Sequence, residues 1–170
     1  MAEAFNSRTL SDAKAERYAE VAAEIAAVLD GEPNFTARMA TVAAMLAQSF
    51  QRFFWVGFYV VDLVHPDQLV VGPYQGSLGC LRIALGQGVC GTAATERRTI
   101  VVPDVEAYPG HIACDSRSRS EIVVPVVGPG GRLVGVLDVD STELDAFDAV
   151  DADWLERILA RAFSDNASLT

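Results

Sequence analysis

Two apolar runs joined by a glycine- and proline-rich segment constrain the fold of this chain more than any other feature. Residues 122–127 and 132–140 are rich in valine, isoleucine and leucine, and the sequence GPGG at 128–131 lies between them. β-Branched runs on either side of such a segment predict a β-hairpin. The chain is therefore expected to contain an antiparallel sheet.

The rest of the pattern adds helices at both ends and further strands in the middle. Apolar residues recur at steps of three and four within 11–50 and 148–163, which predicts two N-terminal helices and one C-terminal helix. Asn34 and Asp148 are the expected N-caps of the second and last helices. Shorter apolar runs predict strands at 53–61, 68–75, 81–84 and 99–102, and a short helix at 89–97.

This order predicts an α+β fold, with helices layered on one antiparallel β-sheet. A length of 170 residues fits a single domain over residues 1–170. Its parts are N-terminal helices at 11–50, the sheet and site loops at 53–141, and the C-terminal helix at 148–163.

The net charge, the N-terminal segment and the number of cysteines limit the expected partners and location. The net charge of −10 repels phosphate backbones and anionic lipids, so neither nucleic acid nor a membrane is an expected partner. No basic segment followed by an apolar run opens the chain, which argues against a secretory signal. Three cysteines is an odd number for a secreted disulfide scaffold. We therefore expect a cytoplasmic location.

The three cysteines are the first candidates for chemistry. Cys114 lies in the polar loop 103–119, close to His111, Arg117 and Arg119, and nearby positive charge favours the reactive thiolate.

Cys90 lies near the start of the predicted helix 89–97, which also favours a thiolate, so position alone does not separate it from Cys114. Its flanking glycines indicate close packing, and we expect a buried structural role for it. Cys80 follows a glycine at a strand edge and is a candidate resolving thiol.

Three acids form the second candidate group. If 128–131 is the turn and Val127 faces Arg132, Glu121 lies opposite Asp138, and Asp140 shares the face of Asp138. Facing carboxylates need positive charge between them. An ammonium group, a metal cation, or one of three arginines meets this need. The three arginines are Arg82, Arg117 and Arg119. Alternatively, the acids cap loops and face water, and spacing leaves both interpretations open.

Aromatic residues form the third group. Trp55, Gly57 and Tyr59 alternate along one strand and point to the same side, so the glycine leaves a gap that a small apolar group can fill. Ordinary core packing is the favoured interpretation without further information. The only histidines are His65 and His111, and no Cys-x-x-Cys or His-x-x-x-His pair exists, so no structural zinc is predicted.

A set of ordered motifs together resembles one enzyme family, the free methionine-(R)-sulfoxide reductases, which are single GAF-domain proteins. The resemblance runs from about residue 55 to the closing helix. The motifs are WVGFY (55–59), GPYQG (72–76), GQGVCGTAA (86–94), VPDV (102–105), GHIACDS (110–116), SRSEIVVP (118–125) and GVLDVDS (135–141).

The resemblance implies an activity and a set of site residues. The family reduces the R epimer of free methionine sulfoxide, not the residue within proteins. Cys114 matches its catalytic cysteine, Cys80 its resolving cysteine, and Cys90 the third cysteine of the motif. The residues that match its substrate-binding positions are Trp55, Tyr59, Glu121, Asp138 and Asp140.

The implied mechanism is thiol-based. The Cys114 thiolate attacks the sulfoxide sulfur, one of the three acids supplies a proton, and a sulfenic acid results. Cys80 then forms a disulfide that a thioredoxin-type donor reduces. No cofactor and no metal are expected, and the family suggests a homodimer. The alternative is a non-catalytic GAF domain that senses a small ligand or redox state, since this fold hosts many functions.

Overall fold

The computed structural model describes residues 2–163 of the chain, with side chains from residue 12 onward. Four α-helices, six strands and two short 3₁₀ turns make up this part. In chain order they are α1 (Ala2–Val28), α2 (Phe35–Ser49), β1 (Trp55–Val61), β2 (Gln68–Gln75), β3 (Arg82–Ala84), α3 (Gly88–Glu96), β4 (Ile100–Val102), η1 (Val105–Ala107), β5 (Ser120–Val127), η2 (Pro129–Gly131), β6 (Leu133–Ser141) and α4 (Ala149–Ala162).

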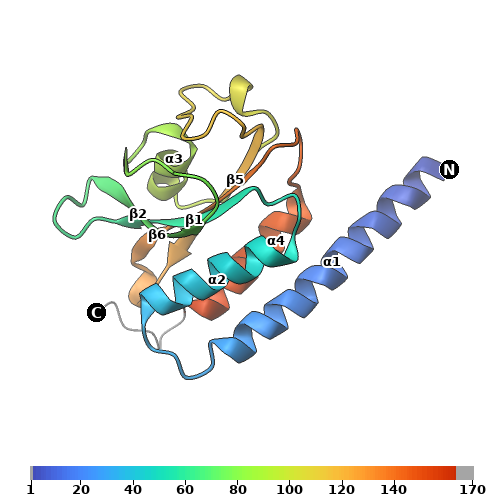
Figure 1. The fold of residues 1–170 in the computed structure, drawn as a ribbon, viewed down its shortest axis with the longest axis horizontal. Helices are drawn as coiled ribbons and strands as arrows, with labels where there is room; N and C mark the ends of the chain where they lie inside the picture. Colours follow the sequence, from blue (N-terminus) through green and yellow to red (C-terminus); the bar gives the residue numbers. More distant parts are fainter. Residues whose placement is uncertain (1, 164–170) are drawn as a thin grey trace.

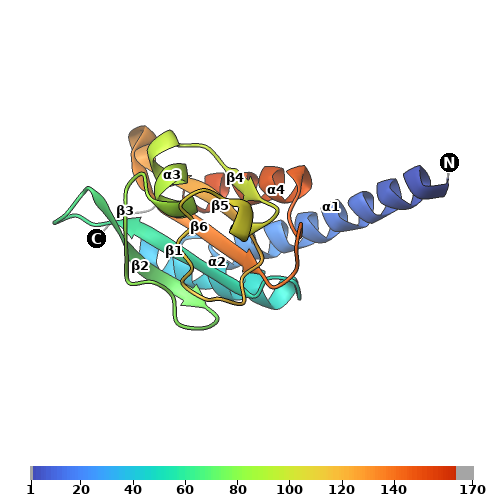
Figure 2. The same cartoon turned by 90° about the horizontal axis from the view of Figure 1, so that it is seen from above.

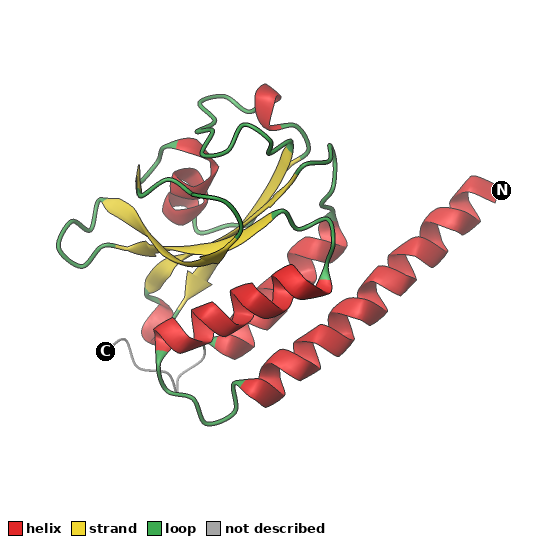
Figure 3. Ribbon diagram, viewed as in Figure 1, coloured by secondary structure: helices red, strands yellow, loops and turns green. Residues whose placement is uncertain are grey.

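The six strands form one sheet in the order β3-β2-β1-β6-β5-β4, and all neighbours pair antiparallel. Helices α1, α2 and α4 lie on one face, while α3 and the long loops cover the other (Figures 1 and 2). Figure 3 shows the resulting three layers. The predicted α+β architecture is confirmed. None of the helices within residues 2–163 combines the length and apolarity needed to cross a bilayer.

Side chains of β1 point alternately to the two faces of the sheet, where they enter two separate cores. Phe58 packs with Leu137 and Leu155 in the larger core beneath the helices. Its neighbour Tyr59 points the other way, into a smaller core with Trp55 beneath α3, because successive side chains of a strand face opposite sides. One strand thus supplies both the structural core and the floor of the opposite face.

The expected caps hold their helices. The Asn34 side chain accepts from the Ala37 amide at the start of α2, and Asp148 forms a capping box with Asp151 at the start of α4. The buried Asp151 also accepts from the Tyr18 hydroxyl at 2.7 Å, which ties α1 to α4. The first helix begins at Ala2 rather than near residue 11, because its first turns lack the apolar periodicity used for the prediction.

The predicted register of the β5–β6 hairpin is wrong by two residues. Glu121 pairs with Asp140, and Asp138 lies opposite Val123. The turn is tighter than expected, with Gly128 donating to the Arg132 carbonyl, and the register shifts again between Val126 and Val127. Because side chains alternate with a period of two, an even shift keeps all three acids on one face.

Candidate active site

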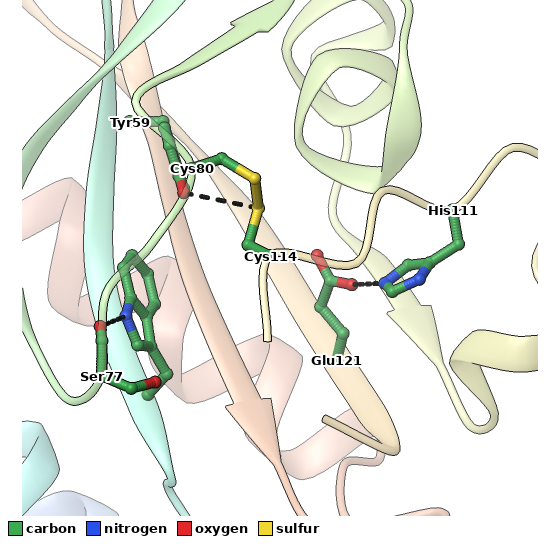
Figure 4. Close-up of a disulfide and its surroundings, with 7 residues drawn as sticks. Tyr59, Ser77, Cys80, His111, Cys114 and Glu121 are labelled. Atoms are coloured by element: carbon green, nitrogen blue, oxygen red, sulfur yellow. Dashed lines mark hydrogen bonds and ion pairs between the residues drawn. A yellow bond between two sulfur atoms is a disulfide. The ribbon is translucent and has the colours of Figure 1, made fainter. Parts of the chain in front are cut away.

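A disulfide joins two loops above the sheet. Cys80 and Cys114 are bonded, with their Cα atoms 5.2 Å apart, a separation usual for disulfides. Figure 4 shows this bond bridging the two loops. Cys114 is exposed and Cys80 is half-buried. Cys90 is free and buried in the first turn of α3, as its flanking glycines indicated.

A polar network fastens the same two loops beside the disulfide. Ser77 Oγ donates to Asp115 Oδ2 at 2.6 Å, and Arg117 donates to both Asp115 oxygens at 3.0 and 2.8 Å. The Arg117 and Ser77 hydrogen bonds lower the pKa of Asp115. We call Ser77, Asp115 and Arg117 the loop clasp. Trp55 adds a contact, since its Nε1 donates to the Ser77 carbonyl at 2.9 Å.

The clasp changes the expected surroundings of Cys114. Arg117 was expected to favour the thiolate, but its guanidinium binds Asp115 and lies 4.7 Å from the centre of the Phe54 ring. His111 was expected to do the same, but its Nε2 lies 3.3 Å from Glu121 Oε2. Both side chains are therefore directed at carboxyl groups rather than at the cysteine, and burial lowers the pKa of His111, which favours its neutral form.

The three predicted acids do gather on one side of the disulfide. Glu121 and Asp138 are only 5% and 7% exposed, and ligand atoms of Cys90, Glu121 and Asp138 all lie within 4.8 Å of one another. Burial, and then the charge of a neighbouring acid, raises the pKa of Glu121, Asp138 and Asp140 well above that of an ordinary carboxyl group. These groups therefore hold protons more readily than exposed acids.

Few neighbouring groups form hydrogen bonds or ion pairs with these three acids. The Cys90 thiol lies within hydrogen-bonding reach of Asp138, as does Glu121, while Asp138 Oδ1 has no partner among the described residues. Ser118 hydrogen-bonds Asp140. Two of the three arginines considered as counter-ions pair with other acids, Arg82 with Asp62 and Arg117 with Asp115. The group is thus arranged to receive a cation.

The aromatic pair forms the adjoining wall. The rings of Trp55 and Tyr59 stack with centroids 5.8 Å apart. The expected gap above Gly57 does not exist, because a Cβ there would lie 2.5 Å from the Trp55 ring and 2.3 Å from Tyr74 Cβ. The Tyr59 hydroxyl lies 4.0 Å from Cys114 Sγ. Burial, followed by the charge of Asp138, raises the pKa of Tyr59, so the hydroxyl keeps its proton.

Two small cavities meet at Cys114. One has a volume of about 30 Å³ and is lined by Cys90, His111 and Glu121. The other has a volume of about 20 Å³ and is lined by Trp55 and Tyr59. Both are lined as well by Cys114, Asp115, Asp138 and Asp140. Each cavity has room for about one or two waters, so neither holds an amino acid in the disulfide form.

The sequence did not predict the loop clasp or the role of Ser118. A local signal exists for one part of the clasp, because Asp115 Oδ1 also accepts from the Arg117 amide two residues on, at 2.9 Å. An aspartate followed by such a turn is common. The partner Ser77 lies 38 residues away, and no spacing rule reveals that contact.

The fold and these residues define a class of protein. The family model described as a GAF domain matches residues 36–162 of the chain, so this is a GAF-domain protein.

Relatives narrow the class further. The chain is 49% identical to GAF domain-containing protein A of Dictyostelium discoideum, covering 86% of this chain and 90% of the relative. It is 40% identical to the free methionine-R-sulfoxide reductase of Escherichia coli, covering 87% of each. A solved free methionine-R-sulfoxide reductase from Neisseria meningitidis, in complex with its substrate, has a TM-score of 0.83 and 48% identity, covering 88% of this chain and 87% of that one. The chain belongs to the free methionine-R-sulfoxide reductases, a family of oxidoreductases.

Proposed function

We propose that this chain reduces free L-methionine (R)-S-oxide to L-methionine with Cys114 as the nucleophile. One observation carries the proposal: Cys114, which is exposed and bonded to Cys80, borders the same cavities as the buried acidic group. A free amino acid offers both of the groups that this arrangement suits, a sulfoxide and an ammonium. A residue within a protein lacks the ammonium.

The acidic group is the proposed ammonium site. Asp138 and Glu121 are buried and no lysine or arginine pairs with them among the described residues. A substrate ammonium would offset their mutual repulsion and supply donors, including one for Asp138 Oδ1. Asp140 completes the group from its place opposite Glu121. Trp55 and Tyr59 would bound the S-methyl end.

The first chemical step is attack of the Cys114 thiolate on the sulfoxide sulfur. The sulfoxide oxygen takes up a proton as the S–O bond breaks, and a carboxyl group with a raised pKa is a suitable donor at neutral pH. Glu121, Asp138 and Asp140 all qualify. The hydroxyl then passes from the substrate sulfur to Cys114 Sγ as the transient bond between the two sulfur atoms breaks, so methionine leaves and Cys114 becomes a sulfenic acid.

The second step closes the disulfide. The Cys80 thiol displaces the sulfenic hydroxyl as water, which gives the bond between Cys80 and Cys114. Cys90 remains buried near Asp138, and we assign it a role in holding that carboxyl group rather than in direct attack. An external dithiol of the thioredoxin type then returns both cysteines to thiols. A homodimer in a reducing cytoplasm is the proposed setting.

Opening the disulfide also has a steric role in this proposal. The two cavities share Cys114 and Asp115 of the loop, and Asp138 and Asp140 of β6. When Cys114 is released from Cys80, its loop is free to withdraw, and the two cavities become one pocket between the aromatic wall and the acids. The substrate would therefore bind only the reduced protein.

The test uses both sulfoxide epimers, each free and peptide-bound, with dithiothreitol or thioredoxin as reductant. Methionine release is expected from the free R epimer alone, and Cys114→Ser is expected to lower turnover by at least a thousandfold. Cys80→Ser is expected to retain a single turnover and leave a sulfenic acid. Binding of the R epimer without consumption would instead support a sensor, and turnover of peptide-bound substrate would contradict the assignment.

A further inference from the structure

The acidic group lies next to a thiol, and the three side chains together form a set of possible metal ligands. Cys90 contributes a thiol from α3, Glu121 a carboxyl group from β5, and Asp138 another from β6. All three are buried, and one ligand atom from each lies within 4.8 Å of the other two. We propose that Cys90, Glu121 and Asp138 form a site for zinc, which the protein binds even while its disulfide is closed.

The unsatisfied atom of Asp138 is the second observation that points to a ligand. Its side chain is 7% exposed and lines the larger cavity, yet Oδ1 has no hydrogen-bond partner in the described part of the chain. Buried polar atoms in proteins nearly always have partners. The cavity of about 30 Å³ admits an ion with a water, whereas it excludes an amino acid.

The donor set selects the kind of ion. A thiolate with two carboxylates suits zinc or another thiophilic divalent ion, whereas magnesium and calcium prefer oxygen ligands alone. Ligand atoms around tetrahedral zinc stand roughly 3.3–3.8 Å apart, so the three side chains need to close by about 1 Å. A water from the cavity completes the fourth position.

His111 supports this site from outside. Its Nε2 lies 3.3 Å from Glu121 Oε2, and Figure 4 shows the imidazole directed at that carboxyl group. Partners of this kind orient carboxylate ligands and tune metal affinity. Glu121 therefore approaches the ion with one oxygen already held.

A bound zinc would regulate the reductase. This consequence rests on the proposed function, because the ion takes the same two carboxylates that we assign to the substrate ammonium. Zinc is then expected to compete with free methionine sulfoxide, which raises the apparent KM and leaves kcat unchanged at saturating substrate.

The test itself needs neither substrate nor turnover. The chain has three cysteines, and the disulfide occupies two, so Cys90 is the only thiol of the oxidised protein. Cobalt added to metal-free, oxidised protein is expected to give a thiolate-to-cobalt absorption band in the near ultraviolet, at one ion per chain. Zinc is expected to remove the band, and a hundredfold excess of magnesium or calcium is not.

Matched variants decide the ligands. Cys90→Ser is expected to abolish the band and Asp138→Asn to weaken zinc binding by at least tenfold, each in protein that melts cooperatively. Glu106→Gln removes an exposed acid outside the site and should leave binding unchanged. The proposal is overturned if the oxidised protein gives no thiolate band, or if Asp138→Asn binds zinc as tightly as the original chain.

Discussion

Asp138 is held in a position that costs stability. Its carboxyl group is buried, one oxygen lacks a partner among residues 2–163, and burial together with the charge of Glu121 raises its pKa. A carboxyl group whose pKa is raised by folding favours the native state below its unfolded pKa of about 4. That contribution is lost as pH rises through the raised value.

Asp138→Asn is therefore expected to stabilise the protein while impairing its function. At pH 7.5 the free energy of unfolding should rise by about 1–3 kcal/mol, since a buried group without partners costs about that much. Near pH 4 most of the gain should vanish, because the native carboxyl group is protonated there and the unfolded one is about half protonated. Urea unfolding at the two pH values measures the difference, and kcat/KM for the free R epimer should fall at least tenfold.

Asp67→Asn serves as the control for this pair of measurements. Asp67 is exposed, and its backbone carbonyl accepts a hydrogen bond from the Leu85 amide. The change should leave unfolding and turnover unaltered at both pH values. A gain for Asp138→Asn that is as large at pH 4 as at pH 7.5 would show that charge burial is not its cause.

The loops that carry the two cysteines depend on the clasp for their relative position. Ser77 lies three residues before Cys80, and Asp115 directly follows Cys114. In the proposed cycle, the hydrogen bond between them would hold Cys80 near the position where the sulfenic acid forms. Its loss leaves the nucleophile in place but lets the loops separate.

Ser77→Ala is expected to slow disulfide formation by roughly two- to tenfold, which corresponds to one hydrogen bond of about 0.5–1.5 kcal/mol. The preceding step, methionine release in a single turnover, should keep its rate. Rapid quenching with a thiol-alkylating reagent separates the two steps. Ser116→Ala alters an exposed serine of the same loop and should change neither. Equal slowing of both steps by Ser77→Ala would place Ser77 in the pocket instead.

The hairpin shows what a sequence does and does not reveal about its elements. The strand pair was predictable, because its apolar runs and turn residues are local signals. Its register was not, because the tighter turn and the shift beside Val127 arise from backbone geometry. The acids nevertheless converged as expected, since an even error preserves the face of every side chain.

The polar contacts between distant segments of the site could not be predicted from local sequence patterns. The contact of Cys90 with Asp138 joins α3 to β6, and that of His111 with Glu121 joins a loop to β5. Such pairs depend on where the sheet brings distant segments together. Residue types alone identified His111 and Arg117 as participants, but they assigned both to Cys114, whereas both side chains contact carboxyl groups.

The two cores of the described residues 2–163 share one sheet, so the redox state of the loops is expected to influence the stability of both. The disulfide closes a segment with a sequence separation of 34 residues. Loop entropy alone predicts a stabilisation of about 4 kcal/mol for a loop of this length. In the proposed cycle a dithiol reopens this disulfide at every turnover, and we expect a smaller stabilisation, because the same free energy opposes the reduction.

The oxidised protein is therefore expected to melt higher than the reduced protein, but by only about 2–6 °C, which matches roughly 1–2 kcal/mol in a chain of this size. Calorimetry with and without a phosphine reductant measures the shift. Cys80→Ser should melt at the same temperature in both conditions, since it cannot close the bond. A difference above about 10 °C would mark the disulfide as a structural staple, and would count against its proposed place in a catalytic cycle.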